Sequence, residues 1–160
     1  MTASDSTKAL DELLEPGSTL MVGTKSGSGQ LEFRPLTVAR VHGGQLQILI
    51  DTTADWAREV ADGDRAWVTL SDTRSNTWVS MEGAALISAD PELIDDLWNT
   101  FADAYFDNGR ESPGIGVLEI DAERGTYWTS PSGRIGSVVS FVKAKLGGAE
   151  DSGGHGQVAV

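Results

Sequence analysis

The glycine pair Gly43-Gly44, which joins two apolar runs, constrains the fold of this chain more than any other feature. A two-residue glycine connection between such runs is typical of a β-hairpin, because its tight turn needs backbone angles that glycine adopts easily. In the run after the turn, Leu46, Ile48 and Ile50 occupy every second position, as in a strand with one buried face. The chain is therefore expected to contain antiparallel strands.

Other short apolar runs, separated by turn residues, extend this pattern. They predict strands at residues 19–25, 31–42, 45–51, 65–71, 77–89 and 115–130, the last with length for a sixth and a seventh strand. Strands of this length and spacing are typical of a small antiparallel barrel. The predicted fold class is mainly β with α-helices (α+β).

The clearest helix signal begins at Pro91, with Asp90 as N-cap, and continues to residue 106. A capping aspartate followed by proline is typical of a helix start. Apolar residues then recur at offsets of one, three and four, which predicts one long helix with a broad apolar face. The residues assigned to that face are Leu93, Ile94, Leu97, Trp98, Phe101, Ala102, Tyr105 and Phe106.

Three further helices are expected around the strands. They are residues 6–14, a short helix capped by Thr53 or Asp55 with Gly63 just past its end, and residues 133–146. All elements fit a single domain of residues 1–146. The glycine-rich remainder, residues 147–160, is predicted to be a flexible tail.

Composition narrows the range of partners. The 160 residues carry a formal net charge of -12, and such a surface repels phosphate backbones and anionic lipid. Neither nucleic acid nor a membrane is therefore an expected partner, and no run approaches the roughly 18 apolar residues of a membrane span. The polar N-terminus does not resemble a secretory signal, and the chain has no cysteine. These features favour a cytoplasmic protein.

The residues also exclude several kinds of chemistry. His42 and His155 have no second ligand in metal-binding spacing, so no metal site is expected. The chain contains no glycine-rich phosphate loop of the nucleotide-binding kinds and no nucleophilic serine elbow. No catalytic acid, base or nucleophile can be assigned, so a cofactor is expected to carry any reaction.

Arg34 is a charged residue inside an apolar run and is followed directly by Pro35. An unpaired buried charge is costly, so Arg34 needs a partner. Proline removes a ladder donor and is tolerated at a strand edge or bulge. An ion pair with Glu32, or with a carboxylate on another strand, is one solution.

Five tryptophans need an explanation of their own. Trp98 is assigned to the core, whereas Trp67 and Trp78 lie on strands and suit a core, a subunit interface or a wall for a planar ligand. Trp56 and Trp128 lie next to turns, where an aromatic ring can pack or stack on a planar ligand.

Three motifs occur in a recognisable order: FRPL in the second strand, LWNTFADAYFDNG in the long helix and RGTYWTSPSGRIG near the end. With the order of elements over roughly residues 6–146, they resemble the FMN-binding split-barrel superfamily of pyridoxamine 5'-phosphate oxidase, specifically its bacterial general stress protein branch. The resemblance implies a six-stranded antiparallel split β-barrel with flanking helices. It also implies a homodimer with flavin bound between the subunits.

The resemblance further implies which residues contact FMN. Arg34 corresponds to the strand arginine that family members use on the flavin phosphate, and a guanidinium offers phosphate a planar fork of donors. The segment 35–37 would run along the isoalloxazine ring, and positions near the fifth strand and the last turn would approach the partner's flavin. The predicted set is Arg34, Pro35, Leu36, Thr37, Asp51, Thr52, Thr53, Trp56, Trp78, Ser80 and Trp128.

The chain departs from the family pattern where the short helix starts. The family usually has a serine and a lysine there, both on the phosphate, and this chain has Ala54 and Trp56 with Asp55 between them. One positive charge is missing and one negative charge is added, which lowers the expected affinity for phosphate. The hydroxyls of Thr52 and Thr53 can still donate.

Three functions remain open from the sequence. The first is a homodimeric flavoprotein that oxidises or reduces a small molecule. The second is a non-enzymatic flavin-binding stress protein, which the departure at Ala54 to Trp56 favours. The third is a protein that binds the deazaflavin F420, with Trp56 as a stacking surface. The basic segment 131–149, with Arg134, is most simply a helix with a solvated face, and with the resemblance a place beside the same cleft is a further hypothesis.

Overall fold

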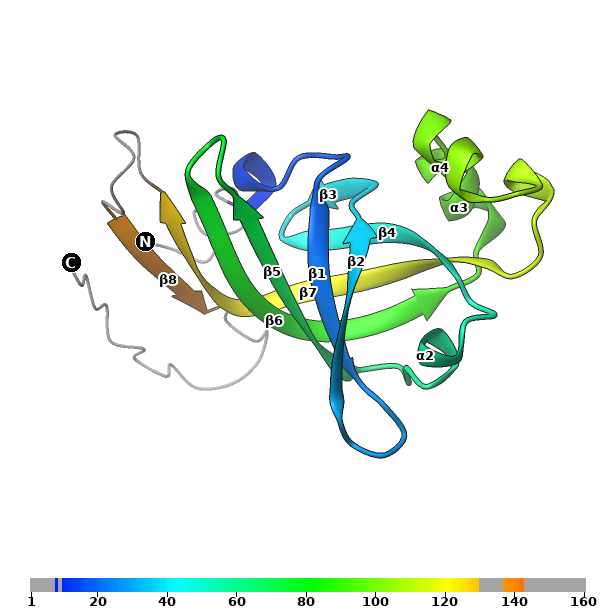
Figure 1. Cartoon of the computed structure of the whole chain (residues 1–160), viewed down its shortest axis with the longest axis horizontal. Coiled ribbons are helices and arrows are strands. Elements are labelled where there is room, and N and C mark those ends of the chain that lie inside the picture. The colour runs from blue at the N-terminus through cyan, green and yellow to red at the C-terminus, as the bar shows by residue number, and fades with distance from the viewer. Residues whose placement is uncertain (1–7, 9, 130–136, 143–160) are drawn as a thin grey trace.

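The computed structural model describes residues 8, 10–129 and 137–142 of the chain. Within this part, eight strands form one antiparallel sheet in the order β2-β1-β5-β6-β7-β4-β3, with β8 added on β7. The strands are β1 (Thr19–Lys25), β2 (Leu31–Thr37), β3 (Arg40–His42), β4 (Gln45–Asp51), β5 (Asp64–Asp72), β6 (Thr77–Ser88), β7 (Ile115–Thr129) and β8 (Ser137–Val142). Figure 1 shows the sheet curling along the long, bent strands β6 and β7. The predicted α+β split barrel is confirmed, with two more strands than expected in the described residues.

Strand β7 serves three neighbours because it is 15 residues long. Its first half pairs with β4 and its second half with β8, while β6 follows its other edge. The register with β6 shifts between Glu82 and Gly83. A Cβ on Gly83 would lie 2.0 Å from the carbonyl oxygen of Asp121, so only glycine fits this irregularity.

The main core lies on the inner face of the curled sheet. Leu46, Ile48 and Ile50 of β4 are buried there, as their alternation predicts. Gly43 and Gly44 have φ angles of 60° and 80° and close the predicted hairpin between β3 and β4. The described part of the first predicted helix, residues 8 and 10–13, is helical, and Leu10 and Leu14 enter the same core.

A second, smaller core lies on the other face of β4 and β7. There α3 (Pro91–Leu97) and α4 (Thr100–Tyr105) cover the sheet, followed by the short 3-10 helix η1 (Gly109–Glu111). Ile94, Leu97, Ala102 and Phe106 pack against Val117 of β7 and its neighbours. Both faces of the sheet are therefore covered by a core at this end. Helix α4 lies beside the end of β2.

The prediction of one long helix from Pro91 to residue 106 is wrong. The helix ends at Leu97, and Asn99 starts α4 by accepting hydrogen bonds from the backbone N–H groups of Phe101 and Ala102. Asparagine competes for backbone donors in this way, which interrupts a helix rather than continuing it. Because of the break, Phe101 and Tyr105 are 58% and 61% exposed instead of facing the core.

The predicted strand 31–42 is divided into β2 and β3. The N–H of Val38 still bonds to Ser18 beside β1, but the N–H of Ala39 bonds to Gln47 of β4. The run changes neighbours at this point, so it turns a corner of the barrel. Apolar periodicity alone does not reveal such a corner.

The predicted helix 133–146 is wrong over residues 137–142, which form β8. The β-branched residues Val138, Val139 and Val142 favour a strand, and the second half of β7 offers an unpaired edge. Their offsets of one, three and four imitate a helical face. The rest of that segment, with Arg134, and the predicted tail 147–160 lie outside the described residues.

The short helix is α2 (Asp55–Arg58), and neither predicted cap residue caps it. Ala54 occupies the N-cap without a side-chain hydrogen bond, and the Thr53 hydroxyl is engaged elsewhere. Gly63, with φ +83°, lies in the turn before β5 rather than at the end of the helix. Among the described residues, no helix is both long and apolar enough to cross a bilayer.

Candidate functional site

A pocket of about 350 Å³ lies between the end of β2 and helix α4. Its size is at the small end of the range for ligand sites, roughly 300 to 1,000 Å³. Pro35, Leu36 and Thr37, three of the predicted site residues, form one wall. The remaining lining residues are Pro16, Gly17, Val38, Ala39, Leu49, Asn99, Thr100, Phe101, Ala102, Tyr105 and Phe106.

The opposite wall of the pocket is aromatic. Phe101 and Tyr105 lie four residues apart on α4, so both side chains project from the same helix face. Phe106 supports this wall, because its ring meets Tyr105 edge-on with centroids 5.0 Å apart and Trp98 at 5.5 Å. The described lining residues include no carboxylate, imidazole, amine or guanidinium. This surface suits a flat apolar ring.

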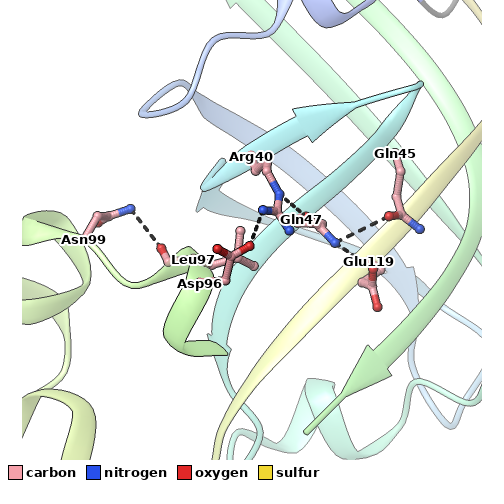
Figure 2. Close-up of polar contacts among 7 residues, drawn as sticks. All are labelled: Arg40, Gln45, Gln47, Asp96, Leu97, Asn99 and Glu119. Atoms are coloured by element: carbon pink, nitrogen blue, oxygen red, sulfur yellow. Dashed lines mark hydrogen bonds and ion pairs between the residues drawn. The ribbon is translucent and has the colours of Figure 1, made fainter. Parts of the chain in front are cut away.

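A polar network holds α3 against the sheet (Figure 2). Arg40 donates to the Oε1 atom of Gln47 at 2.7 Å and forms an ion pair with Asp96 of α3. The Nε2 atom of Gln47 donates to Glu119 of β7 at 2.9 Å and more weakly to Gln45. Gln47 is almost fully buried, so its amide needs both sets of partners. The network therefore fixes α3, the helix that precedes the aromatic wall.

Arg34 lies just before the pocket wall but faces the other way. Its neighbour across the ladder is Val22, so its side chain points to the inner face, and the side chain is only 15% exposed. The guanidinium donates to the Oγ1 atom of Thr24 at 2.9 Å and stacks on Trp56, with 4.5 Å to the ring centroid. Glu32 lies 3.8 Å away, so the ion pair weighed from the sequence is present.

Burial lowers the pKa of Arg34, and the charges of Glu32 and Glu59 act in the opposite direction. The lowered pKa has no effect on its charge near neutral pH, since an arginine titrates far above that range. Arg34 therefore remains a cation, with an aromatic face, a hydroxyl and two carboxylates around it.

The end of β4 is a compact turn whose hydroxyl groups are already engaged. The Oγ1 atom of Thr52 donates to the carbonyl oxygen of Gly114 at 2.7 Å. The backbone N–H and the hydroxyl of Thr53 both donate to the Oδ1 atom of Asp51, at 2.8 and 2.6 Å. Gly114 has φ +73°, and a Cβ there would lie 2.4 Å from Thr53, so glycine is required.

Helix α2 brings one cation that the sequence did not single out. Arg58 lies 3.7 Å from the carboxylate of Asp55, and its charge also acts on Asp51. The hydrogen bonds from Thr53 are the main cause of the lowered pKa of Asp51, and Arg58 contributes less. Each arginine near α2 is thus matched by carboxylates.

Trp78, Ser80 and Trp128 do not join the other predicted site residues. Ser80 pairs with Thr69, which pairs with Met21, which pairs with Pro35. This row runs along the outer face of the sheet, whereas Arg34 belongs to the inner face. Trp78 and Trp128 pair with each other on the same outer face. Within one chain they lie apart from the Arg34 group.

Residues 35–37, which the sequence assigns to a flavin, thus line this pocket, whereas the residues of its opposite wall were not singled out. Phe101 and Tyr105 were assigned to a buried face, because the break at Asn99 was not foreseen. The signal was present, since asparagine followed by threonine in a periodic run is a possible helix start. Among the described residues, no group of three or more metal-ligating side chains gathers in one place.

Comparison with known proteins supports the family that the sequence motifs resemble. A family model described as pyridoxamine 5'-phosphate oxidase like matches residues 5–151. Protein bli-3 of Neurospora crassa is 22% identical over 162 residues, covering 90% of this chain and 78% of bli-3. The general stress proteins predicted from the motifs are represented among similar solved structures.

Two of these structures illustrate the likeness. A candidate general stress protein 26 from Jannaschia sp. CCS1 aligns with a TM-score of 0.72 and 23% identity, covering 86% of this chain and 98% of that one. The general stress FMN/FAD-binding protein of Xanthomonas citri aligns with a TM-score of 0.64 and 23% identity. The alignment covers 91% of this chain and 97% of that one. At these identities the likeness establishes the fold.

Proposed function

Since the chain belongs to the pyridoxamine 5'-phosphate oxidase-like family, we propose that it binds a flavin, with which it oxidises or reduces a small molecule. FMN is the flavin that the sequence predicts. The observation that carries the proposal is the pocket between β2 and α4, because it includes the segment 35–37 that was assigned to the isoalloxazine ring. The flavin binding stated for the Xanthomonas citri protein supports the same ligand class.

The residues present fit the ring of a flavin. Pro35, Leu36 and Thr37 line one side of the pocket, and Phe101 and Tyr105 line the other. A flat aromatic ligand gains from stacking and from leaving water in such a pocket. Arg34, which the resemblance assigns to the flavin phosphate, precedes this wall in the chain but points to the inner face of the sheet.

A bound flavin supplies hydride exchange, which no side chain can provide. The chain would bind and orient the ring and exclude water from it. Because the described lining residues carry no charged group, they are suited to positioning rather than to general acid–base catalysis. The same observation favours the second candidate function, a flavin-binding stress protein without turnover.

The purified protein tests the flavin proposal directly. We expect a yellow protein, or a colourless one whose melting temperature rises when FMN is added, because a ligand that binds only the folded state stabilises it. F420 in the same assay tests the deazaflavin alternative. Absence of both colour and stabilisation would contradict flavin binding.

A pocket-filling pair of variants sharpens this test. Thr100 lines the pocket and is exposed, so Thr100→Trp should block the ring while leaving the core intact. Thr73→Trp makes the same exchange in the exposed β5–β6 turn and serves as the control. We expect FMN stabilisation to disappear only in Thr100→Trp. Oxidation of the reduced flavin by added quinones, faster in the protein than for free flavin, would separate an oxidoreductase from a binding protein.

We also propose that the protein is a homodimer that pairs through the outer face of the sheet. Met21, Leu31 and Phe33 are 41%, 46% and 44% exposed on this face. Trp78 and Trp128 lie half-buried in the same face. An apolar, aromatic sheet face of this kind is typical of a protein–protein interface. In a dimer, Trp78, Ser80 and Trp128 would approach the partner's flavin, as the resemblance implies.

A further inference from the structure

Resting on the proposed flavin binding, we infer that this site holds its flavin through the ring and gains little from the phosphate, so that riboflavin binds nearly as tightly as FMN. The inference concerns the surroundings of Arg34 and of α2. Three features of these surroundings oppose a strong phosphate site.

The first feature is that Arg34 is already engaged. One face of the guanidinium stacks on Trp56 at 4.5 Å, one N–H donates to Thr24, and Glu32 lies 3.8 Å away. A strong phosphate contact needs two parallel N–H groups of the same plane, free of competing partners. The side chain is also only 15% exposed, so a phosphate would have to lose much of its own hydration to reach it.

The second feature is the balance of charge. The charges of Glu32 and Glu59 both act on Arg34, Asp55 lies 3.7 Å from Arg58, and the charge of Arg58 acts on Asp51. Two cations therefore face four carboxylates. Asp51 is ionised at neutral pH, and the hydrogen bonds from Thr53 lower the pKa of its carboxyl further. A phosphate monoester carries about 1.5 to 2 negative charges at neutral pH and would add to this excess.

The third feature is the lack of free hydroxyl donors at the end of β4. Thr52 gives its proton to the carbonyl of Gly114 and Thr53 gives its proton to Asp51. Both acceptors are fixed in the turn, and the Thr53 acceptor is itself negative. A phosphate would have to replace these bonds rather than add new ones.

The ring side of the site shows the opposite character. The pocket wall is neutral, and Phe101 and Tyr105 are exposed toward it without a covering segment among the described residues. Stacking and apolar burial act on the isoalloxazine ring, which riboflavin and FMN share. The two ligands differ only in the phosphate, the group that the resemblance assigns to Arg34.

The test compares the dissociation constants of riboflavin and FMN for the full chain by quenching of flavin fluorescence. We expect the two constants to agree within about tenfold, which corresponds to about 1.4 kcal/mol. FMN binding more than about tenfold tighter would overturn the inference while leaving flavin binding intact. Binding of neither ligand would instead contradict the proposed function, and the inference with it.

Two substitutions at Trp56 add a second readout. Trp56→Lys uncovers the guanidinium and adds a cation, so we expect FMN to gain at least about tenfold over riboflavin. Trp56→Phe keeps an aromatic face and adds no cation. Its preference for FMN over riboflavin should equal that of the unaltered protein. Because each preference is a ratio within one variant, a partial loss of folding affects both ligands alike. An unchanged ratio in Trp56→Lys would contradict the inference.

Discussion

Asp51 links the strand end to the charge of the site through two hydrogen bonds from Thr53. A carboxylate that gains such donors on folding is stabilised in its ionised form, so its pKa falls below its usual value of about 3.9. The stabilisation is therefore fully present above that ordinary value, and is lost as the pH falls through the lower pKa of the folded state. The pH dependence of this stabilisation is opposite in sign to that of a group whose pKa rises on folding.

A substitution at this residue tests the sign. Asp51→Ala should lower the free energy of unfolding at neutral pH by about 1 kcal/mol, a typical value for a partly exposed hydrogen-bonded group. In urea unfolding near pH 3 the difference between variant and unaltered protein should shrink, since the carboxyl of Asp51 is then largely protonated in the unfolded chain. Thr53→Val removes only the hydroxyl donor and should show a smaller effect of the same sign. An equal loss at both pH values would contradict this account.

Helix α4 is the element on which the pocket most depends. Asn99 ends the preceding segment and starts α4 with two hydrogen bonds to backbone N–H groups, so one side chain decides where Phe101 and Tyr105 point. The network from Arg40 to Asp96 holds the neighbouring helix α3 against β4 (Figure 2). The aromatic wall is thus set by polar contacts rather than by apolar periodicity.

Removal of this cap tests the role of the element. Asn99→Ala should lower the free energy of unfolding by about 1 kcal/mol, as for other N-cap truncations. Flavin affinity should fall as well, because Phe101 and Tyr105 lose their fixed position. Asn99→Asp retains an accepting oxygen at the N-cap and should restore both quantities to near their original values. Weaker flavin binding in Asn99→Asp, equal to that of Asn99→Ala, would show that the cap is not the cause.

The elements also show how far the sequence could predict this molecule. The bounds of β1 and β4 are those predicted, because turn residues flank each run and one face is buried. The predictions failed where a segment changes partner: at the corner after Thr37, at the break before α4, and in β8. Each of these depends on an unpaired edge or a free backbone donor elsewhere in the fold, which local periodicity does not contain.

For the candidate site, the sequence could predict single residues but not the contacts between distant elements. The resemblance assigned residues 35–37 to the flavin, and they line the pocket, but the surroundings of Arg34 were not predicted. The contacts of Arg34 with Thr24 and Trp56 join residues from β1, β2 and α2. No spacing within one segment of the sequence could predict them. The assignment of the site residues to a bound flavin stays a prediction, which the variants above address.

At the scale of the whole molecule, the two faces of the sheet differ in how far they are buried. The inner face is closed by the main core, and α3 with α4 covers only the β4 and β7 end of the outer face. The rest of the outer face exposes Met21, Leu31 and Phe33 beside half-buried tryptophans. Phe33 is held flat on β1, since a Cβ on Gly23 would lie only 2.7 Å from its ring. This face is the proposed contact with a second copy.

Phe33→Glu tests that contact, because it places a charge on the exposed β2 edge of the face without disturbing either core. In analytical ultracentrifugation at micromolar concentration we expect the unaltered chain to sediment as a dimer and Phe33→Glu as a monomer. Phe101→Glu makes the same exchange at an aromatic residue that is 58% exposed on α4, and should remain dimeric. A monomeric unaltered chain, or equal dissociation of both variants, would contradict the proposed interface. If the partner's Trp78, Ser80 and Trp128 complete the site, the Phe33→Glu monomer should also bind flavin at least about tenfold more weakly.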